Sequence, residues 1–365
     1  MGKVLVLGKG VSGEAAASLA AAEGHSVEFA DRVDFVVASP GVRVMSELEY
    51  GCRALAARGW KMLAVTGSKG KSSVVKIVAD AISASGVRAV ACGNYGRPVS
   101  DLCRVDVPGW AVVEVSSFML ETTSLAPGTF EAAAILNLQE DHLDRHLSVE
   151  LYHALKRRLL TMAKTYVSPQ EPSQEDESLL RGSYFDNDIL RSNGLAAAFL
   201  MRVAGLGDED IARAFSSFEA LPHRMCTVAE IDGVRYVDDS KATSVEALAA
   251  GVIMAGSCAG GQKVRLIAGG KGKGDDPSVA IPALTKWGKK VYLIGENAGG
   301  LFAAWSNSIE CEISSTMDKA VEAATRDAEK GDVVLLSPGA ASFDQFKNFG
   351  ERGDFFARIV KTRKI

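Results

Sequence analysis

The chain has 365 residues, of which 47% are hydrophobic and 24% charged, and this length exceeds what one hydrophobic core usually organises. Its net charge of -4 provides no basic surface for a nucleic-acid backbone or an anionic membrane, so neither is expected as a partner. The six cysteines form no C-x-x-C pair, which argues against a zinc knuckle or a disulfide framework and favours the reducing cytoplasm. The apolar runs are short, so we expect neither a membrane span nor a signal peptide.

Short β-branched runs that end in glycine alternate with longer alanine-rich segments, as in VLVLG followed by EAAASLAAAEG. Such runs are typical of parallel strands that are buried on both faces and joined by helices. The predicted fold class is therefore α/β, with domain boundaries near residues 61 and 221. The predicted domains are 1–60, 61–220 and 221–365.

The first glycine motif, Gly8 to Gly13, has the spacing G-x-G-x-x-G and follows an apolar run. Asp31 lies at a suitable distance along the chain to bind a ribose. Taken alone this pattern indicates NAD, but the same geometry accepts any diphosphate.

The stretch VTGSKGKSS, residues 65–73, follows the apolar run MLAV and precedes apolar positions at helical spacing. Lys71 is therefore predicted to begin a helix that Gly86 stops. A glycine loop between a strand and a helix directs backbone N–H groups and the helix dipole at one point, which suits a phosphate. Lys71 would reach the β- and γ-phosphates, and the Ser72 hydroxyl would ligate Mg²⁺. The alternative is an ordinary strand-to-helix turn, since Val65 stands where a phosphate loop usually has its first glycine.

Charged residues follow two further apolar runs. Glu114 lies in the run VVEVSSF, where a carboxylate is costly unless it is paired, binds a metal or faces water from an edge strand. His142 and His146 have the i, i+4 spacing of half a zinc site, but no third soft ligand accompanies them. Lys156 falls in the helical pattern YHALKRRLL, where sequence alone favours a solvated lysine.

The last third of the chain carries two polar motifs. Arg224 in LPHRM can neutralise a γ-phosphate, and Asp239 in YVDDSKAT can accept hydrogen bonds from a ribose, although an exposed charged turn is the alternative. Near the end, SPGAASFDQFKNFGERGDFF is predicted to form a helix that partly buries Phe343, Phe346 and Phe349. The polar segment 168–188 is predicted to be a surface excursion without chemistry.

These motifs together resemble the Mur ligase family, the ATP-dependent amide-forming enzymes of peptidoglycan precursor synthesis. T-G-S-K-G-K-S resembles the family loop T-G-[ST]-x-G-K-[ST], and the patterns E-x-S-S-F-x-L-E, N-x-x-E-D-H-x-D, H-R and D-S-K-A-T follow in the family's order. The ending S-x-D-x-F-x-x-F-x-x-R-G-x-x-F resembles the D-glutamate-adding branch, and the D-N-P-R of the diaminopimelate-adding branch is absent. Ser244 stands where the family usually has Asn.

The resemblance implies the residues for ATP and for chemistry. It places ATP on Gly67, Ser68, Lys69, Gly70, Lys71, Ser72, Ser73, Asn193, Arg224 and Asp239. It implies Lys71, Glu114, His142, Lys156 and Lys241 as catalytic residues. Two Mg²⁺ ions are implied on Ser72, Glu114, His142 and a carbamylated Lys156. A lysine that reacts with CO₂ must be neutral, which burial favours.

The resemblance also implies the substrates UDP-N-acetylmuramoyl-L-alanine and D-glutamate. The uridine nucleotide of the first would contact Val11, Ser12, Gly13, Asp31, Arg32 and Gly41. Asn94 and Ser116 are implied as further substrate-binding residues. The second would contact Thr243, Lys273, Ser342, Phe343 and Phe349. ATP would phosphorylate the substrate carboxylate, and the amine of D-glutamate would attack the resulting acyl phosphate. A cytoplasmic monomer is expected.

The resemblance implies three domains: a Rossmann-like first domain, a central parallel-sheet domain like that of P-loop ATPases, and a Rossmann-like last domain. The segment that usually follows the positions of Asp31 and Arg32 is almost absent, so the first domain is truncated and is expected to hold uridine with fewer contacts. Three alternatives stay open: a related ligase for another amino acid such as L-glutamate, a non-catalytic binding protein of the same fold, and a nicotinamide oxidoreductase.

Overall fold

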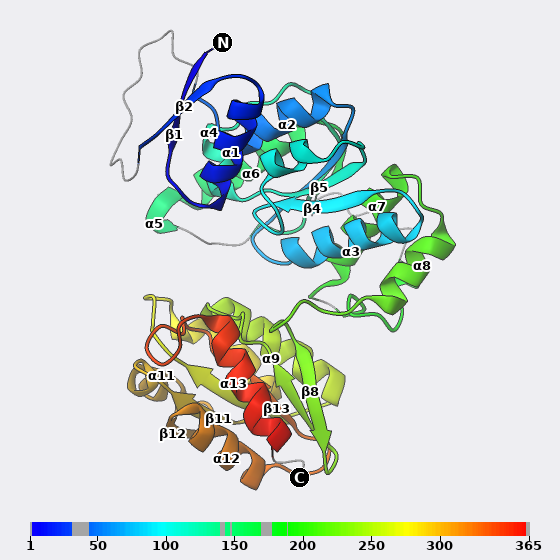
Figure 1. The fold of residues 1–365 in the computed structure, drawn as a ribbon. Coiled ribbons are helices and arrows are strands. Elements are labelled where there is room, and N and C mark those ends of the chain that lie inside the picture. The colour runs from blue at the N-terminus through cyan, green and yellow to red at the C-terminus, as the bar shows by residue number, and fades with distance from the viewer. Residues whose placement is uncertain are drawn as a thin grey trace. The chain divides into compact units, whose positions relative to one another are not determined.

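The computed structural model describes residues 2–30, 44–138, 143–146, 148–168, 177–187 and 189–362. The chain forms two compact units, Met1–Phe218 and Glu219–Ile365 (Figure 1). Both contain parallel sheets with helices, which confirms the α/β class. The separation of residues 1–60 as a domain of its own stays a prediction. No helix in these described ranges is both long and apolar enough to cross a membrane.

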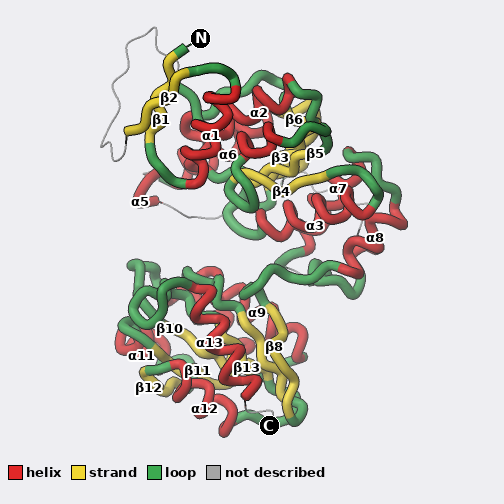
Figure 2. Tube along the Cα trace, viewed as in Figure 1, coloured by secondary structure: helices red, strands yellow, loops and turns green. Residues whose placement is uncertain are grey.

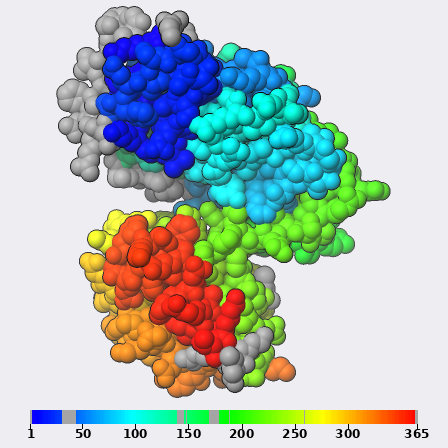
Figure 3. Space-filling view, viewed as in Figure 1, coloured from blue at the N-terminus to red at the C-terminus, as the bar shows by residue number. Residues whose placement is uncertain are grey.

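The first unit begins with a small parallel sheet of β1 and β2, on which α1 packs. Leu5 and Leu7 on β1 are 58% and 41% exposed, so one face of this sheet is open to solvent in the described structure. Helix α1 also packs against α2 and η1, and in the space-filling view its residues adjoin those of the central part of the unit (Figure 3). The elements are β1 (Lys3–Leu7), α1 (Val11–Ala22), β2 (Ser26–Ala30), α2 (Glu47–Ala57) and η1 (Val99–Arg104).

The larger sheet of the first unit is entirely parallel, in the order β4-β5-β3-β6-β7. Residues 62–66 of β3 are buried, as expected for a central strand covered on both faces. Its strands are β3 (Lys61–Thr66), β4 (Ala89–Gly93), β5 (Trp110–Glu114), β6 (Phe130–Ile135) and β7 (Ala163–Val167). Its helices are α3 (Lys71–Ala84), α4 (Ser117–Thr122), α5 (Leu143–His146), α6 (Val149–Arg157), η2 (Arg158–Met162), η3 (Glu177–Leu180), α7 (Arg191–Val203) and α8 (Asp208–Ser217). Because β3 lies between β5 and β6, the loop after β3 meets the carboxyl ends of both neighbours.

The second unit has one sheet in the order β12-β11-β10-β13-β9-β8, in which only β8 is antiparallel to its neighbour. Helices α9, α10 and α11 cover one face, whereas α12 and α13 cover the other (Figure 2). Its strands are β8 (Cys226–Ile231), β9 (Val234–Asp238), β10 (Val264–Gly269), β11 (Gly288–Ile294), β12 (Cys311–Ser315) and β13 (Val333–Leu336). Its helices are α9 (Val245–Ala259), η4 (Pro277–Ala280), α10 (Ile281–Trp287), α11 (Ala298–Trp305), α12 (Met317–Asp327) and α13 (Phe349–Thr362).

The predicted helix around Phe343 is wrong, because α13 begins only at Phe349. Residues 342–348 form turns and bends, in which the backbone N–H of Phe346 donates to the carbonyl of Ser342 at 2.8 Å. Asp344 helps to hold the backbone in this non-helical conformation, because its carboxylate accepts a hydrogen bond from the backbone N–H of Glu296. Phe343 is consequently 70% exposed.

The polar excursion is also better anchored than its composition predicts. Leu180 and Phe185 are fully buried, and Phe185 stacks edge-on against Phe215 of α8 at 5.6 Å between ring centroids. The described end of the segment, residues 177–187, is therefore part of the packing of the first unit.

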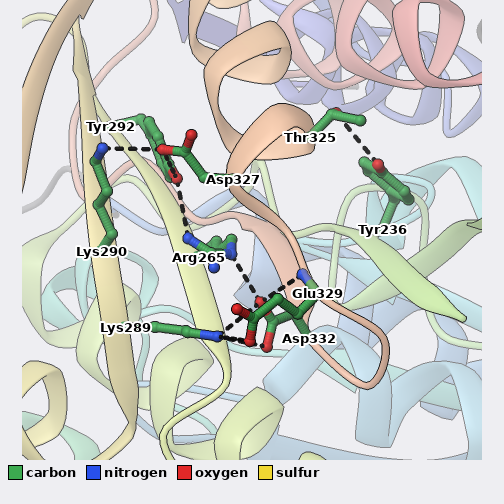
Figure 4. Close-up of polar contacts among 9 residues, drawn as sticks. All are labelled: Tyr236, Arg265, Lys289, Lys290, Tyr292, Thr325, Asp327, Glu329 and Asp332. Carbon is green, nitrogen blue, oxygen red and sulfur yellow. Dashed lines mark hydrogen bonds and ion pairs between the residues drawn. The ribbon is translucent and has the colours of Figure 1, made fainter.

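A buried ion pair joins the amino-terminal ends of two central strands in the second unit (Figure 4). Nε of Arg265 on β10 donates to Asp332 just before β13 at 2.7 Å, and both side chains are at least 94% buried. Arg265 also donates to the hydroxyl of Tyr292 at 3.3 Å, and that hydroxyl donates to Asp327 at 3.0 Å. Burial raises the pKa of Tyr292 to about 12, so its hydroxyl keeps the proton that it donates.

Substitution Asp332→Ala is expected to lower the free energy of unfolding of the second unit by about 3 kcal/mol, because it leaves the Arg265 charge buried without its partner. The control is Arg326→Ala: the Arg326 side chain is 63% exposed, so its ion pair with Asp327 is expected to contribute little to stability. Urea unfolding measures both, and equal losses in the two variants would contradict the structural role of the buried pair.

Candidate functional site

The loop between β3 and α3 has the geometry of a phosphate-binding loop. α3 begins at Lys71, as predicted, and its first internal bond runs from the N–H of Val74 to the carbonyl of Gly70. Gly67 and Gly70 have φ values of +150° and +85°, which side chains rarely adopt. A Cβ at Gly70 would also collide with the side-chain amide of Asn193 on α7. The loop therefore requires glycine at both positions and directs the start of a helix toward one point.

Two lysines converge on one carbonyl of this loop. Nζ of Lys71 donates to the carbonyl oxygens of Gly67 and Ser68 at 2.7 and 3.0 Å. Nζ of Lys156, from α6, donates to the same Gly67 oxygen at 3.0 Å. The Ser68 hydroxyl lies 3.1 Å from the hydroxyl of Tyr152. Positive charge is thus concentrated at the loop, which favours an anionic ligand.

Lys156 is only 1% exposed, so the alternative of a solvated helix lysine is wrong. Its ammonium group donates a hydrogen bond to the Gly67 carbonyl and also lies 4.5 Å from the centroid of the Tyr152 ring. The helical pattern YHALKRRLL could not predict this burial, because it depends on packing of α6 against elements far away in the sequence.

A carboxylate lies one strand away from the loop. Glu114 ends β5 and pairs in register with Val65 of β3, and it is 2% exposed. Its Oε1 accepts from Nδ2 of Asn94 at 2.7 Å, but its buried Oε2 has no hydrogen-bond partner among the described residues. An ionised oxygen without a partner is costly when buried, and a cation would compensate it. Glu114 therefore fits a magnesium ligand, and the edge-strand alternative is wrong because β4 pairs with the other side of β5.

The other predicted metal ligands are only partly described. Ser72 lies half-buried in the first turn of α3, whereas His142 lies outside the described residues. His146 is not an available ligand: its Nε2 lies 2.9 Å from the Ser117 hydroxyl, and its Nδ1 lies 3.3 Å from Glu121. In the described part of the chain no cluster of three His, Cys, Asp or Glu side chains could hold a metal ion.

The predicted uridine-binding residues lie around the start of α1. Val11 begins this helix and is 73% exposed, and Ser12 is exposed beside it. A Cβ at Gly13 would collide with the carbonyl of Gly8, so the helix approaches the preceding loop closely only because Gly13 lacks one. The remaining uridine residues, Asp31, Arg32 and Gly41, lie outside the described residues. Ser116, predicted to bind substrate, caps α4 by accepting from the N–H of Met119.

In the second unit, Asp239 lies directly after β9 and is buried. The Ser337 hydroxyl donates to its carboxylate at 2.8 Å. Burial raises the pKa of Asp239 to about 7, and the positive charge of Arg224 opposes this rise. The two residues predicted for ribose and γ-phosphate are thus electrostatically coupled.

The H-R motif, the D-S-K motif and Phe349 come together around a histidine. Nδ1 of His223 lies 2.7 Å from Asp238, its carbonyl accepts from the N–H of Lys241 at 3.0 Å, and its ring lies 6.2 Å from that of Phe349. The Lys241 ammonium group lies 3.9 Å from the centroid of the Phe349 ring. Lys241 is therefore placed beside one of the aromatic rings predicted to bind the amino acid.

Sequence reasoning missed Arg352, which connects two of these loops. It is 1% exposed, donates to the hydroxyl and the carbonyl of Ser240 at 3.0 and 2.9 Å, and donates to the carbonyl of Ala340 at 3.0 Å. Burial lowers the pKa of its guanidinium group to about 10. Arg352 is the arginine of the R-G pattern near the end of the chain, but the pattern does not predict these hydrogen-bond partners.

The residues predicted to hold the amino acid differ in exposure. Ser342 is 3% exposed and lies two residues after Ala340, so Arg352 helps to place it. Thr243 is half-buried, and Lys273 is exposed. Asn137, the first residue of the N-x-x-E-D-H-x-D pattern in the first unit, contacts the phosphate loop directly, which sequence reasoning missed.

A glycine-dependent phosphate loop at the centre of a parallel sheet, with a buried acid on the neighbouring strand, defines an α/β protein of the nucleotide-binding class. The model of the Mur ligase middle domain matches residues 65–170, and that of the Mur ligase glutamate ligase domain matches residues 223–339. The chain belongs to the Mur ligase family.

Relatives with the name UDP-N-acetylmuramoylalanine–D-glutamate ligase match most of the chain. The one from Hahella chejuensis is 37% identical over 340 residues, covering 82% of this chain and 75% of the relative. The one from Chlamydia caviae is 31% identical over 414 aligned positions, covering 98% of this chain and 97% of the relative. That alignment is longer than this chain of 365 residues, so the relative contains segments that this chain lacks.

Solved structures agree in fold. UDP-N-acetylmuramate-alanine ligase MurC from Thermotoga maritima has a TM-score of 0.63 at 15% identity, over 99% of this chain and 100% of that chain. MurF ligase from Thermotoga maritima, in complex with ADP, has a TM-score of 0.63 at 18% identity, over 99% of this chain and 95% of that chain.

Proposed function

We propose that this chain is an ATP-dependent ligase that joins D-glutamate to UDP-N-acetylmuramoyl-L-alanine in peptidoglycan precursor synthesis, acting as a monomer in the cytoplasm. It is supported by the relatives of that name, which align over up to 98% of the chain, and by residues 342–356, which resemble the ending of the D-glutamate-adding branch. The observation that carries the ATP half is the loop Gly67–Gly70 with the Lys71 ammonium group on its carbonyls.

The loop residues would bind the nucleotide triphosphate. The first turn of α3 offers backbone N–H groups without intrahelical acceptors, and these suit phosphate oxygens. Lys71 would exchange its contacts with Gly67 and Ser68 for oxygens of the β- and γ-phosphates. The same positive charge would then stabilise the phosphoryl group while it moves to the substrate carboxylate.

Glu114 and Ser72 would hold Mg²⁺, and His142 with a carbamylated Lys156 would hold a second ion. The unpartnered Oε2 of Glu114 supports this assignment. When bound, Mg²⁺ neutralises negative charge on the phosphates. The burial of Lys156 favours the neutral amine that adds to CO₂, with release of one proton, to give the carbamate.

The second half of the reaction would use the second unit. The acyl phosphate formed from ATP and the substrate carboxylate is attacked by the neutral amine of D-glutamate, and the amide forms as inorganic phosphate leaves. We assign Thr243, Lys273, Ser342, Phe343 and Phe349 to the amino acid. Lys241, beside Phe349, would stabilise the negative charge on the carbonyl oxygen during the attack.

Substitution Lys71→Ala is expected to lower phosphate release by at least about 100-fold, because a charge directed at the transferred phosphoryl group is lost. The assay measures the release that depends on both UDP-N-acetylmuramoyl-L-alanine and D-glutamate. Lys76→Ala is the matched control, since Lys76 lies on the same helix but pairs with Asp80. Wild-type turnover in Lys71→Ala would exclude this ATP site.

The same assay on the wild-type chain tests the amino acid. Phosphate release with L-glutamate but not with D-glutamate would exclude the proposed amino acid. No release with any amino acid would indicate a binding protein.

Substitution Lys156→Ala is expected to abolish activity, and formate or acetate is expected to restore part of it by supplying the missing carboxylate. Lys164→Ala, which removes an exposed partner of Glu131, is the control and should keep full activity without rescue. Full activity of Lys156→Ala without a carboxylate would refute the carbamate. The same phosphate-release assay decides between these results.

A further inference from the structure

Asn137 makes several contacts with the phosphate loop, and the proposed function assigns it no role. It lies two residues after the end of β6, half-buried beside the loop. Its Oδ1 accepts from the backbone N–H of Lys69 at 2.7 Å, and its Nδ2 donates to the carbonyl of Lys69 at 2.9 Å. Its own carbonyl accepts from the N–H of Ser68 at 3.0 Å. One residue thus bonds to three polar groups of the backbone of two adjacent loop residues, Ser68 and Lys69.

The paired contact with Lys69 requires a side-chain amide. It needs one acceptor and one donor on the same planar group, and an asparagine supplies both. An aspartate would keep the acceptor but would place a second oxygen against the Lys69 carbonyl. Because the two bonds lie on opposite sides of the Lys69 Cα, they fix the peptide planes before and after it.

The hydrogen bonds of Asn137 restrain the part of the loop whose own residues leave the backbone most flexible. Glycines flank Ser68 and Lys69, and glycine loses more conformational freedom on ordering than any other residue. Both Gly67 and Gly70 have positive φ values, so small changes at Lys69 would redirect the amides on either side. Asn137 also donates to Oδ1 of Asn193 at 3.4 Å, and Asn193 packs directly against Gly70. The amide of Asn137 therefore connects three segments: the loop, the end of β6 and α7.

We propose that Asn137 is a positioning residue for the nucleotide phosphates. By holding Lys69 from both sides it keeps the amides of the loop in the orientation that receives the β-phosphate, before any nucleotide is present. This inference rests on the proposed function, because it assumes that the loop binds a nucleotide. A loop arranged in advance binds more tightly, since binding does not have to order it.

The test compares ADP and AMP binding to the full chain by calorimetry at one fixed Mg²⁺ concentration. Asn137→Ala removes three side-chain hydrogen bonds, two of them to Lys69, and is expected to weaken ADP binding by at least about tenfold. AMP lacks the β-phosphate, so its affinity is expected to change by less than about twofold. A fall in the ratio of ADP affinity to AMP affinity is a readout that general loss of stability would not produce.

Asn187→Ala is the matched control. Asn187 also donates to one backbone carbonyl, that of Tyr184, and accepts from two backbone N–H groups, but none of these three contacts is with residues 67–70. This variant is expected to keep the wild-type ratio. Asn137→Asp preserves the shape and one of the two contacts, so it tests the same ratio should Asn137→Ala not fold.

Three results would overturn the inference: an ADP affinity of either Asn137 variant within about twofold of wild type, equal weakening of ADP and AMP, or the same fall in Asn187→Ala. Failure of the wild-type chain to bind ADP would instead refute the proposed function, and the inference with it. The two failures are therefore distinguishable.

Discussion

The backbone between β3 and α3 must reverse within four residues, at φ values that only glycine adopts easily, and the neighbouring elements are arranged around this reversal. β5 brings Glu114 beside it, α6 brings Lys156 onto its carbonyl, and α7 packs Asn193 against Gly70. None of these side chains could move far without loss of a buried contact. These contacts hold the loop at the centre of a parallel sheet, and the proposed transfer of a phosphoryl group requires groups that are held in place in this way.

In the second unit, buried polar side chains likewise hold the loops of the candidate site. Its candidate site consists of loops at the carboxyl ends of β9, β10 and β13, which have no regular structure to hold them. Arg352 compensates by binding Ser240 and Ala340 at once, and the His223–Asp238 pair holds the backbone that carries Lys241. At the amino-terminal ends of the strands, the Arg265–Asp332 pair joins two central strands. Polar contacts therefore order both ends of the strands, and the apolar clusters between these ends supply the core.

Local pattern predicted the α/β class, the strand before the loop, the start of α3 at Lys71 and the place of Glu114 at a strand end. Each of these depends on neighbours within a few residues. Asn137 and Arg352 were missed because their partners lie 68 and 112 residues away, and no local pattern encodes such contacts. The helix around Phe343 was wrong for the same reason: Asp344 binds the backbone of Glu296, a distant segment. Asp31, Arg32, Gly41 and His142 stay predictions, since they lie outside the described residues.

Transfer of oxygen from the substrate carboxylate to phosphate would show whether the loop delivers a phosphoryl group from ATP to that carboxylate. UDP-N-acetylmuramoyl-L-alanine would be labelled with ¹⁸O in its carboxylate and converted with ATP and D-glutamate, and the released phosphate would be analysed by mass spectrometry. If an acyl phosphate forms, its bridging oxygen comes from the carboxylate and leaves with the phosphate, so each phosphate carries one ¹⁸O. Amide product accompanied by unlabelled phosphate would contradict the account.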